Sequence, residues 1–275
     1  MNRIEKAARS ILRKSVPSGV RRWIWLNRMP ESATVGRAER ERLFRQREEK
    51  GIKNIPVFIV SFNRLSYVKQ MVSWLEQKGH TNIVIIDNAS TYPPLLAYYD
   101  TIPYDVIQMD RNYGHLVFWE SDRFDAYRQD FYMLSDPDVA PVAECPDDFE
   151  EVFFRILKNN PHIKKAGFSL KIDDIPLGED AMFGADVYEW EKQFYKSKTK
   201  DGYFADIDTT FAMYPPDAIS GRAFSYCAIR AFEPYQLRHL PWYKKKNDIT
   251  EEDQFYSDSK LCSVGAWTPT KSEDP

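Results

Sequence analysis

Four short runs of apolar residues follow one another along the first half of the chain, and each run ends in polar residues. A helical spacing of apolar positions, from Ser66 to Lys78, separates the first two runs. Short runs separated by helix-sized segments are typical of buried parallel strands that helices cover on both faces. The pattern predicts an α/β domain with a mainly parallel sheet. The runs are residues 55–60, 83–86, 104–108 and 131–134.

The second half of the chain has a less regular pattern. A helix is predicted over 147–159, and an apolar run covers 165–170, but no clear period follows. We therefore expect a helical extension over residues 1–50 and one main domain over residues 51–275.

The first 28 residues are basic and can form an amphipathic helix. They carry eight lysine and arginine residues against Glu5 alone, although the whole chain has a net charge of −3. Such a segment suits the surface of an anionic membrane. The alternatives are a helix packed on the main domain or paired with another subunit in an oligomer. The charged segment 37–50 predicts a solvated connecting helix.

The composition is that of a globular protein. With 275 residues, 43% of them hydrophobic and 29% charged, the chain can bury a large core, which excludes disordered and fibrous classes. Cys145, Cys227 and Cys262 are widely spaced and predict neither a disulfide framework nor a zinc site. No apolar run approaches the roughly 20 residues that span a bilayer. We expect a cytoplasmic protein, at the inner face of the membrane if the first 28 residues bind lipid. Because the basic residues gather in that one segment, nucleic acid is not expected as a partner.

Polar residues suited to chemistry stand where the apolar runs end. The carboxyl ends of parallel strands meet at one edge of a sheet, where such sheets bind ligands. The paired carboxylates of Asp136-Pro137-Asp138 suit a hard cation such as Mg²⁺ or Mn²⁺. This spacing alone is a weak signal, since Asp206-Ile207-Asp208 repeats it. In chain order, the candidate residues of these loops are Ser61, Asn63, Arg64, Asp87, Arg111, Asn112, Gly114, His115, Asp136 and Asp138.

Taken together, these positions resemble the nucleotide-sugar-binding half of family 2-like glycosyltransferases, which have the GT-A fold. The resemblance covers roughly residues 55–142, so that 143–275 would form the acceptor half. It implies that Asp87 contacts the base and that Asp136 lies near the ribose and the metal. Asp138 becomes the direct metal ligand.

The other loop residues have roles that follow from the same resemblance. Residues 57–64 look like the first strand and its nucleotide-contacting loop, with Ser61, Asn63 and Arg64 toward the donor. Arg111, Asn112 and Gly114 resemble the element that meets the nucleotide or its phosphates. His115 can reach a phosphate or a sugar hydroxyl, or it caps or packs. Helix capping is also the alternative for Asp87 and Asn63.

The second half offers a catalytic base and a further metal ligand. In the family, an acidic pair that opens a helix supplies the base, and Glu252-Asp253 matches this pair loosely. The alternative is capping, because Thr250 and Asp253 have the spacing of a capping box. His239 is the candidate metal or diphosphate ligand, with a packed structural histidine as the alternative. Asp208 is a candidate contact for a sugar hydroxyl.

The resemblance implies metal-dependent transfer of a sugar from a nucleoside-diphosphate sugar, with inversion and with a UDP-sugar favoured. The acceptor would be a glycan or a lipid-linked saccharide, as in the synthesis of surface polysaccharide or glycoconjugates. A sugar nucleotidyltransferase is an alternative, although the loop at 61–64 lacks the glycine that cradles a triphosphate. A catalytically inactive, glycan-binding or scaffolding relative is another, although Asp87, Asp136 and Asp138 are all present.

Overall fold

A computed structural model describes residues 36–216, 218 and 225–259. The chain divides into two compact units, Met1–Gly36 and Arg37–Pro275, and the fold below is that of the second. The predicted membrane-surface segment over 1–28 lies outside the described residues, as does Cys262. Of the described helices, none is long and apolar enough to cross a membrane.

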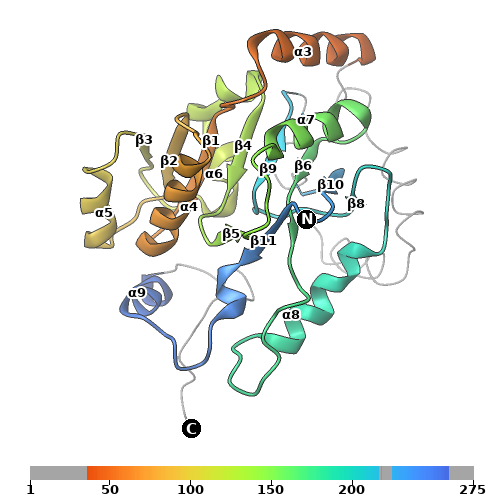
Figure 1. The fold of residues 1–275 in the computed structure, drawn as a ribbon. Coiled ribbons are helices and arrows are strands. Elements are labelled where there is room, and N and C mark those ends of the chain that lie inside the picture. Colours follow the sequence, from red (N-terminus) through yellow and green to blue (C-terminus); the bar gives the residue numbers. More distant parts are fainter. Residues whose placement is uncertain (1–35, 217, 219–224, 260–275) are drawn as a thin grey trace, which may run out of the picture. The chain divides into compact units, whose positions relative to one another are not determined.

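The four predicted strands are present and lie side by side. They form the order β3-β2-β1-β4 within an eight-stranded sheet, and each neighbouring pair among them is parallel (Figure 1). The sheet continues as β9-β6-β10-β8, in which β8 and β9 run antiparallel to their neighbours. The predicted α/β fold with a mainly parallel sheet is confirmed. The strands are β1 Val57–Ser61, β2 Ile83–Asp87, β3 Asp105–Gln108, β4 Tyr132–Ser135, β6 Lys165–Gly167, β8 Tyr203–Phe204, β9 Ala212–Tyr214 and β10 Ala228–Arg230.

Helices flank this sheet, and short 3-10 turns lie between some of the elements. The two helices predicted from spacing, over 66–78 and 147–159, are both present to within two residues. The described helices are α3 Arg37–Lys50, α4 Leu65–Gln77, α5 Pro93–Tyr99, α6 Val117–Glu120, α7 Phe149–Asn159, α8 Gly184–Glu191 and α9 Glu251–Ser259.

The strands β1, β2 and β4 are apolar at nearly every position because both faces of this part of the sheet are covered. Successive side chains of a strand point to opposite faces. In β1, Val57 and Ile59 enter one core with residues of α4 and α7, whereas Phe58 enters a second core with Val117 and Phe118 of α6. A strand buried on both sides loses the alternation of polar and apolar residues. This is the physical reason for the continuous runs in the sequence.

A second, three-stranded sheet has the order β5-β11-β7. Its strands are β5 Val139–Pro141, β7 Ser169–Leu170 and β11 Gln236–His239. The apolar run at 165–170 therefore does not form one strand. Its first part is β6 of the large sheet, and its second part is β7 of the small one. Because β5 directly follows Asp138, this small sheet brings the late part of the chain to the end of β4.

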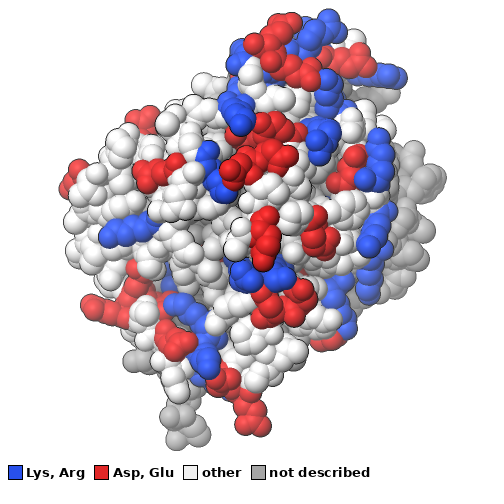
Figure 2. Space-filling view, in the orientation of Figure 1, with Lys and Arg blue, Asp and Glu red and all other residues white. Residues whose placement is uncertain are grey.

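Helix α3 has a charged outer face and a buried inner face. Figure 2 shows lysine, arginine, aspartate and glutamate side chains intermingled over this helix, at the top of the view. Phe44 is nevertheless only 3% exposed, and its ring lies 4.9 Å from that of Phe131. Arg40 donates hydrogen bonds of 3.0 Å to the carbonyls of Leu157 and Ile163. The charged sequence predicted the solvated outer face of the helix but did not indicate its buried inner face.

Candidate functional site

The order of the large sheet reverses at β1. The chain moves from β1 outward through β2 and β3, and it then returns to form β4 on the other side of β1. Sheets of this kind bind ligands outside the carboxyl ends of their strands, at the point where the order reverses. Residues 61–64 at the end of β1 and residues 136–138 after β4 flank this point.

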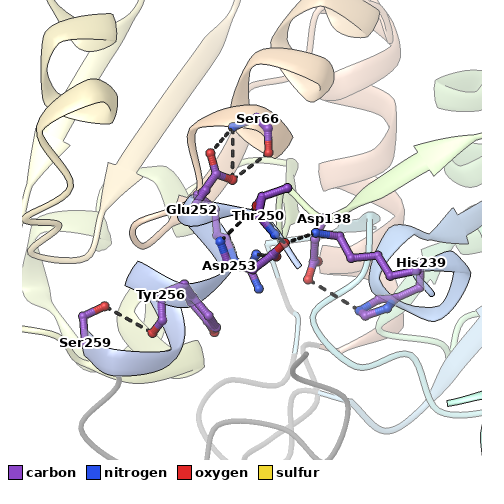
Figure 3. Close-up of polar contacts among 10 residues, drawn as sticks. Ser66, Asp138, His239, Thr250, Glu252, Asp253, Tyr256 and Ser259 are labelled. Atoms are coloured by element: carbon purple, nitrogen blue, oxygen red, sulfur yellow. Dashed lines mark hydrogen bonds and ion pairs between the residues drawn. The ribbon is translucent and has the colours of Figure 1, made fainter. Parts of the chain in front are cut away.

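Asp138 and His239 meet because β5 and β11 pair. The two strands are antiparallel, with His239 opposite Val139, and the Leu240 amide donates a 2.8 Å hydrogen bond to the Asp138 carbonyl. His239 Nε2 lies 3.7 Å from Asp138 Oδ2 (Figure 3). The sequence predicted both side chains as metal ligands, and the structure brings them together.

Both side chains keep a polar atom that the described residues do not satisfy. Asp138 Oδ1 and His239 Nδ1 are buried and have no hydrogen-bond partner in the described part of the chain. Buried polar atoms are nearly always paired, so a polar atom without a partner needs an explanation. A ligand that supplies the missing interaction is one such explanation.

The pair fits a divalent cation in its chemistry. A carboxylate oxygen and an imidazole nitrogen are donors that Mn²⁺ accepts, and Mg²⁺ and Mn²⁺ complete their coordination with water and phosphate oxygens. Within the described ranges, no group of three or more His, Cys, Asp or Glu side chains is arranged to hold a metal. Asp138 and His239 are two neighbouring side chains with donor atoms of this kind.

Asp136 is half-buried beside this pair and is held by the segment before β9. Its amide donates a 3.0 Å hydrogen bond to the Thr209 carbonyl, and its carboxylate accepts one from the Thr209 hydroxyl. Burial, followed by the neighbouring Asp138 charge, raises the pKa of Asp136 well above its usual range, although the Thr209 hydrogen bond opposes the shift. The carboxylates of Asp136 and Asp138 repel each other, and a cation between them would relieve the repulsion.

Lys165 is a buried part of this region that the sequence did not single out. Its side chain is 1% exposed, and its ammonium donates to the carbonyls of Ile207 (3.0 Å) and Asp208 (2.5 Å). Burial lowers the pKa of Lys165 to about 7, against the attraction of Asp208 and Asp136. The Asp208 side chain is exposed. In the sequence, Lys165 could have been recognised as a lysine inside an apolar run.

Asp87 belongs to a buried polar cluster at the ends of β1 and β2. It is 2% exposed and accepts hydrogen bonds from the Tyr99 hydroxyl (3.1 Å) and the Ser90 amide (3.2 Å). The Tyr99 hydroxyl also lies 3.0 Å from Ser61 Oγ. Burial raises the pKa of Asp87. Asp87 does not cap α5, whose first residue follows Tyr92 without a side-chain cap.

Asn63 braces the loop that leads into α5. Its Oδ1 accepts from the amides of Thr91 (2.7 Å) and Tyr92 (3.0 Å), and its Nδ2 donates to Ser259 Oγ (2.8 Å). Its backbone has a φ of 52°, a left-handed conformation that asparagine tolerates better than most residues. Contact with a nucleotide stays a prediction for Asn63, whose side chain is engaged within the protein.

The loop after β3 is tied to the loop after β2. Asn88 Nδ2 donates to Asn112 Oδ1 (2.9 Å) and to the Gly114 carbonyl (3.0 Å), and the Gly114 amide donates to Asn112 Oδ1 (2.7 Å). Gly114 has a φ of 70°, which favours glycine. Arg111 and His115 are exposed on this turn. Asn112 and Gly114 therefore shape the loop, and Arg111 and His115 present their side chains to solvent.

Asp253 is the most heavily bonded carboxylate near the site. It is 1% exposed, accepts hydrogen bonds from Arg64 and Lys244, and accepts from Thr250 N (3.0 Å) and Oγ1 (2.8 Å) (Figure 3). Its own amide donates to Thr250 Oγ1 (3.2 Å), which completes the capping box that the spacing predicted. Burial raises its pKa, but the bonds from Lys244, Thr250 and Arg64 outweigh burial and lower it to about 2.

Glu252 anchors the same helix to the start of α4. It accepts hydrogen bonds from the amide (3.0 Å) and hydroxyl (2.6 Å) of Ser66, in the first turn of that helix, where backbone amides lack helical partners. Tyr256 lies under Arg64, whose guanidinium carbon is 4.0 Å from the ring centroid. Glu252 and Asp253 thus fix α9 to α4. A carboxylate with a pKa of about 2 is a weak base, so these contacts favour anchoring over proton transfer for Asp253.

We compared the chain with models of known protein families and with curated proteins. No family model and no curated protein matches it.

Proposed function

We propose that the protein is a metal-dependent glycosyltransferase with a GT-A fold. It would transfer a sugar from a nucleoside-diphosphate sugar, with a UDP-sugar favoured, to a saccharide or a lipid-linked saccharide. The observation that carries the proposal is the Asp138 and His239 pair. Each side chain has a buried polar atom without a partner among the described residues, at the point where the sheet order reverses.

The donor site would extend from this pair across the strand ends. A divalent cation supplies charge neutralisation for a departing diphosphate. Asp138 and His239 would hold this cation, with Asp136 behind them. The buried cluster around Asp87 offers a carboxylate for the base, and the exposed side chains of Arg111 and His115 can turn toward phosphates.

The acceptor side is built from the second half of the chain. Inverting transfer needs a carboxylate that removes the proton of the attacking hydroxyl. Glu252 and Asp253 stay the predicted pair for this role, although both are bonded within the protein. Asp208 presents an exposed carboxylate close to Asp136, where it suits a sugar hydroxyl.

The metal site is tested by Asp138→Asn, which keeps the size of the side chain and removes its charge. Binding of UDP in the presence of Mn²⁺ would be measured by isothermal titration calorimetry on the full chain. Loss of an outer-shell partner of a metal costs about 10–100-fold in affinity, so loss of a direct ligand is expected to weaken binding at least about a hundredfold.

The matched control is Asp100→Asn, at the exposed end of α5. This variant should bind UDP as the wild type does. Equal Mn²⁺-dependent affinity of Asp138→Asn and the wild type would contradict the metal site.

A further inference from the structure

Tyr67 carries a buried hydroxyl that no described residue satisfies. The residue lies in the first turn of α4 and is 6% exposed, and its hydroxyl has no hydrogen-bond partner in the described part of the chain. Two cations flank its ring. The Arg64 guanidinium carbon lies 5.2 Å from the ring centroid, and the Lys244 ammonium lies 5.6 Å from it.

The hydroxyl of Tyr67 is a hydrogen-bond donor at neutral pH. Burial raises its pKa, and Asp138 and Asp253 raise it further, whereas Arg64 opposes them. A protonated phenol that is buried without a partner needs an acceptor. Helix α4 packs against β5, the strand that directly follows Asp138, so the hydroxyl and the candidate metal ligand belong to neighbouring elements.

The charges around Tyr67 indicate which acceptor fits. Arg64 and Lys244 share a single carboxylate, that of Asp253, so the pair keeps one positive charge. Glu252 faces the start of α4 and is bonded to Ser66 there. The Lys244 side chain is 19% exposed, so it can also meet a ligand from solvent. An anionic oxygen satisfies both the phenol and the ammonium.

We propose that the Tyr67 hydroxyl and the Lys244 ammonium form a subsite for one phosphate group of a ligand, beside Asp138 and His239. The inference rests on the proposed function, since a cation at Asp138 would offset the charge of that carboxylate and the donor would bring the diphosphate. Asp253 then acts as an internal anion that competes with the ligand for Arg64 and Lys244. The Asp253 carboxylate, and not the docking of α9 as such, therefore weakens phosphate binding.

Tyr67→Phe tests the subsite, because it removes only the hydroxyl. The probes are inorganic pyrophosphate and UDP, each with Mn²⁺, titrated calorimetrically into the full chain. A hydrogen bond to a charged group stabilises a complex more than one between neutral groups. The affinity for both probes is therefore expected to fall about tenfold or more. The melting temperature should stay equal or rise, since the variant no longer buries an unpaired hydroxyl.

The matched control is Tyr203→Phe. Tyr203 is similarly buried, at 5% exposure, but lies on β8, four strands away from β4 in the sheet order. Its hydroxyl bonds to Glu233 (3.1 Å), so the variant loses a tyrosine hydroxyl far from the subsite. Its affinity for both probes should match that of the wild type.

Asp253→Asn tests whether the Asp253 carboxylate competes with the ligand for the two cations. Removing the internal negative charge should strengthen pyrophosphate binding severalfold, whereas Tyr67→Phe weakens it. Glu252→Gln is the control, since it weakens the other anchor of α9 without releasing a cation, and it should give no gain. A gain of the same size in Glu252→Gln would assign the effect to loosening of α9 and would overturn the competition.

The outcomes separate this inference from the proposed function. If the wild type binds the probes and Tyr67→Phe binds them equally well, the hydroxyl meets only water and the subsite is wrong. If binding depends on Tyr67 but not on Asp138 or Mn²⁺, the subsite stands and the metal-dependent function falls. If the wild type binds neither probe, both fall.

Discussion

At the scale of single residues, the polar atoms around Asp253 fall into two groups. Asp253 and Glu252 have their oxygens engaged by cations, amides and hydroxyls. Asp138, His239 and Tyr67, close by, each keep a buried atom without a partner among the described residues. The first group stabilises the fold. The second group leaves hydrogen-bonding atoms unpaired, and these are the atoms that a ligand can contact.

The bonds of Asp253 predict how stability depends on pH. Its folded-state pKa of about 2 lies below the usual value of 3.8, so ionisation favours the folded state. This contribution is complete above about pH 4 and is lost as the pH falls toward 2. The shift corresponds to roughly 2 kcal/mol. The free energy of unfolding of wild type and Asp253→Asn, measured by urea denaturation, should differ more at pH 6 than at pH 2 by about that amount. A difference independent of pH would contradict the ion pairs.

The sequence predicted some of these residues and missed others for physical reasons. Asp138 was predicted because its place after a buried strand is local information. That His239 faces Asp138 depends on the pairing of β5 with β11, which join distant parts of the chain. Tyr67 gave no signal, because an aromatic residue on the apolar face of a helix looks like ordinary core. Lys165 was visible as a lysine inside a strand.

At the scale of elements, α3 has a charged sequence but is fixed to the sheet domain by buried residues. Phe44 packs in the same core as β1 and α7, and Arg40 bonds to carbonyls at and beyond the end of α7. Carbonyls at a helix end lack helical partners, so this arginine satisfies groups that would otherwise be unpaired. Helix α3 is thus attached to the sheet domain by packing and by hydrogen bonds.

Phe44→Ala is expected to lower the free energy of unfolding by about 3–5 kcal/mol, the usual cost of removing a buried phenylalanine ring. Chemical denaturation monitored by circular dichroism measures the change. Arg42→Ala on the same helix is the control, because Arg42 is 53% exposed and pairs only with Glu39 in the described structure. It should change stability by less than about 0.5 kcal/mol. Similar small losses in both variants would mean that α3 is held only weakly.

The elements that the sequence predicted are those with a strong local pattern. The strands β1, β2 and β4 were found because burial on both faces leaves continuous apolar runs, whereas β3 is a half-buried edge strand with Val106 and Ile107 in its middle. The small sheet was not predicted, since strands of two to four residues such as β7 and β11 show no period. The split of residues 165–170 between two sheets likewise depends on partners far along the chain.

At the scale of the whole molecule, the topology decides where chemistry can occur. The order β3-β2-β1-β4 places the ends of β1 and β4 on either side of the reversal, and the small sheet brings β11 to the same edge. Of the residues in the proposed ligand site, Asp138 and Tyr67 come from the first half of the chain, and His239 and Lys244 come from the second half. Contact with a membrane through residues 1–28 stays a prediction, testable by the binding of this chain to anionic vesicles at low salt.

We propose that this edge of the sheet binds a nucleoside diphosphate together with a divalent cation. The most direct measurement is a thermal-shift screen of nucleoside diphosphates and their sugars, with and without Mn²⁺, on the wild type and on Asp138→Asn. A ligand that binds only the folded state raises the melting temperature. We predict that one diphosphate, with UDP favoured, stabilises the wild type only when Mn²⁺ is present and does not stabilise Asp138→Asn. No stabilisation of the wild type by any of these compounds would contradict the proposed binding of a nucleoside diphosphate.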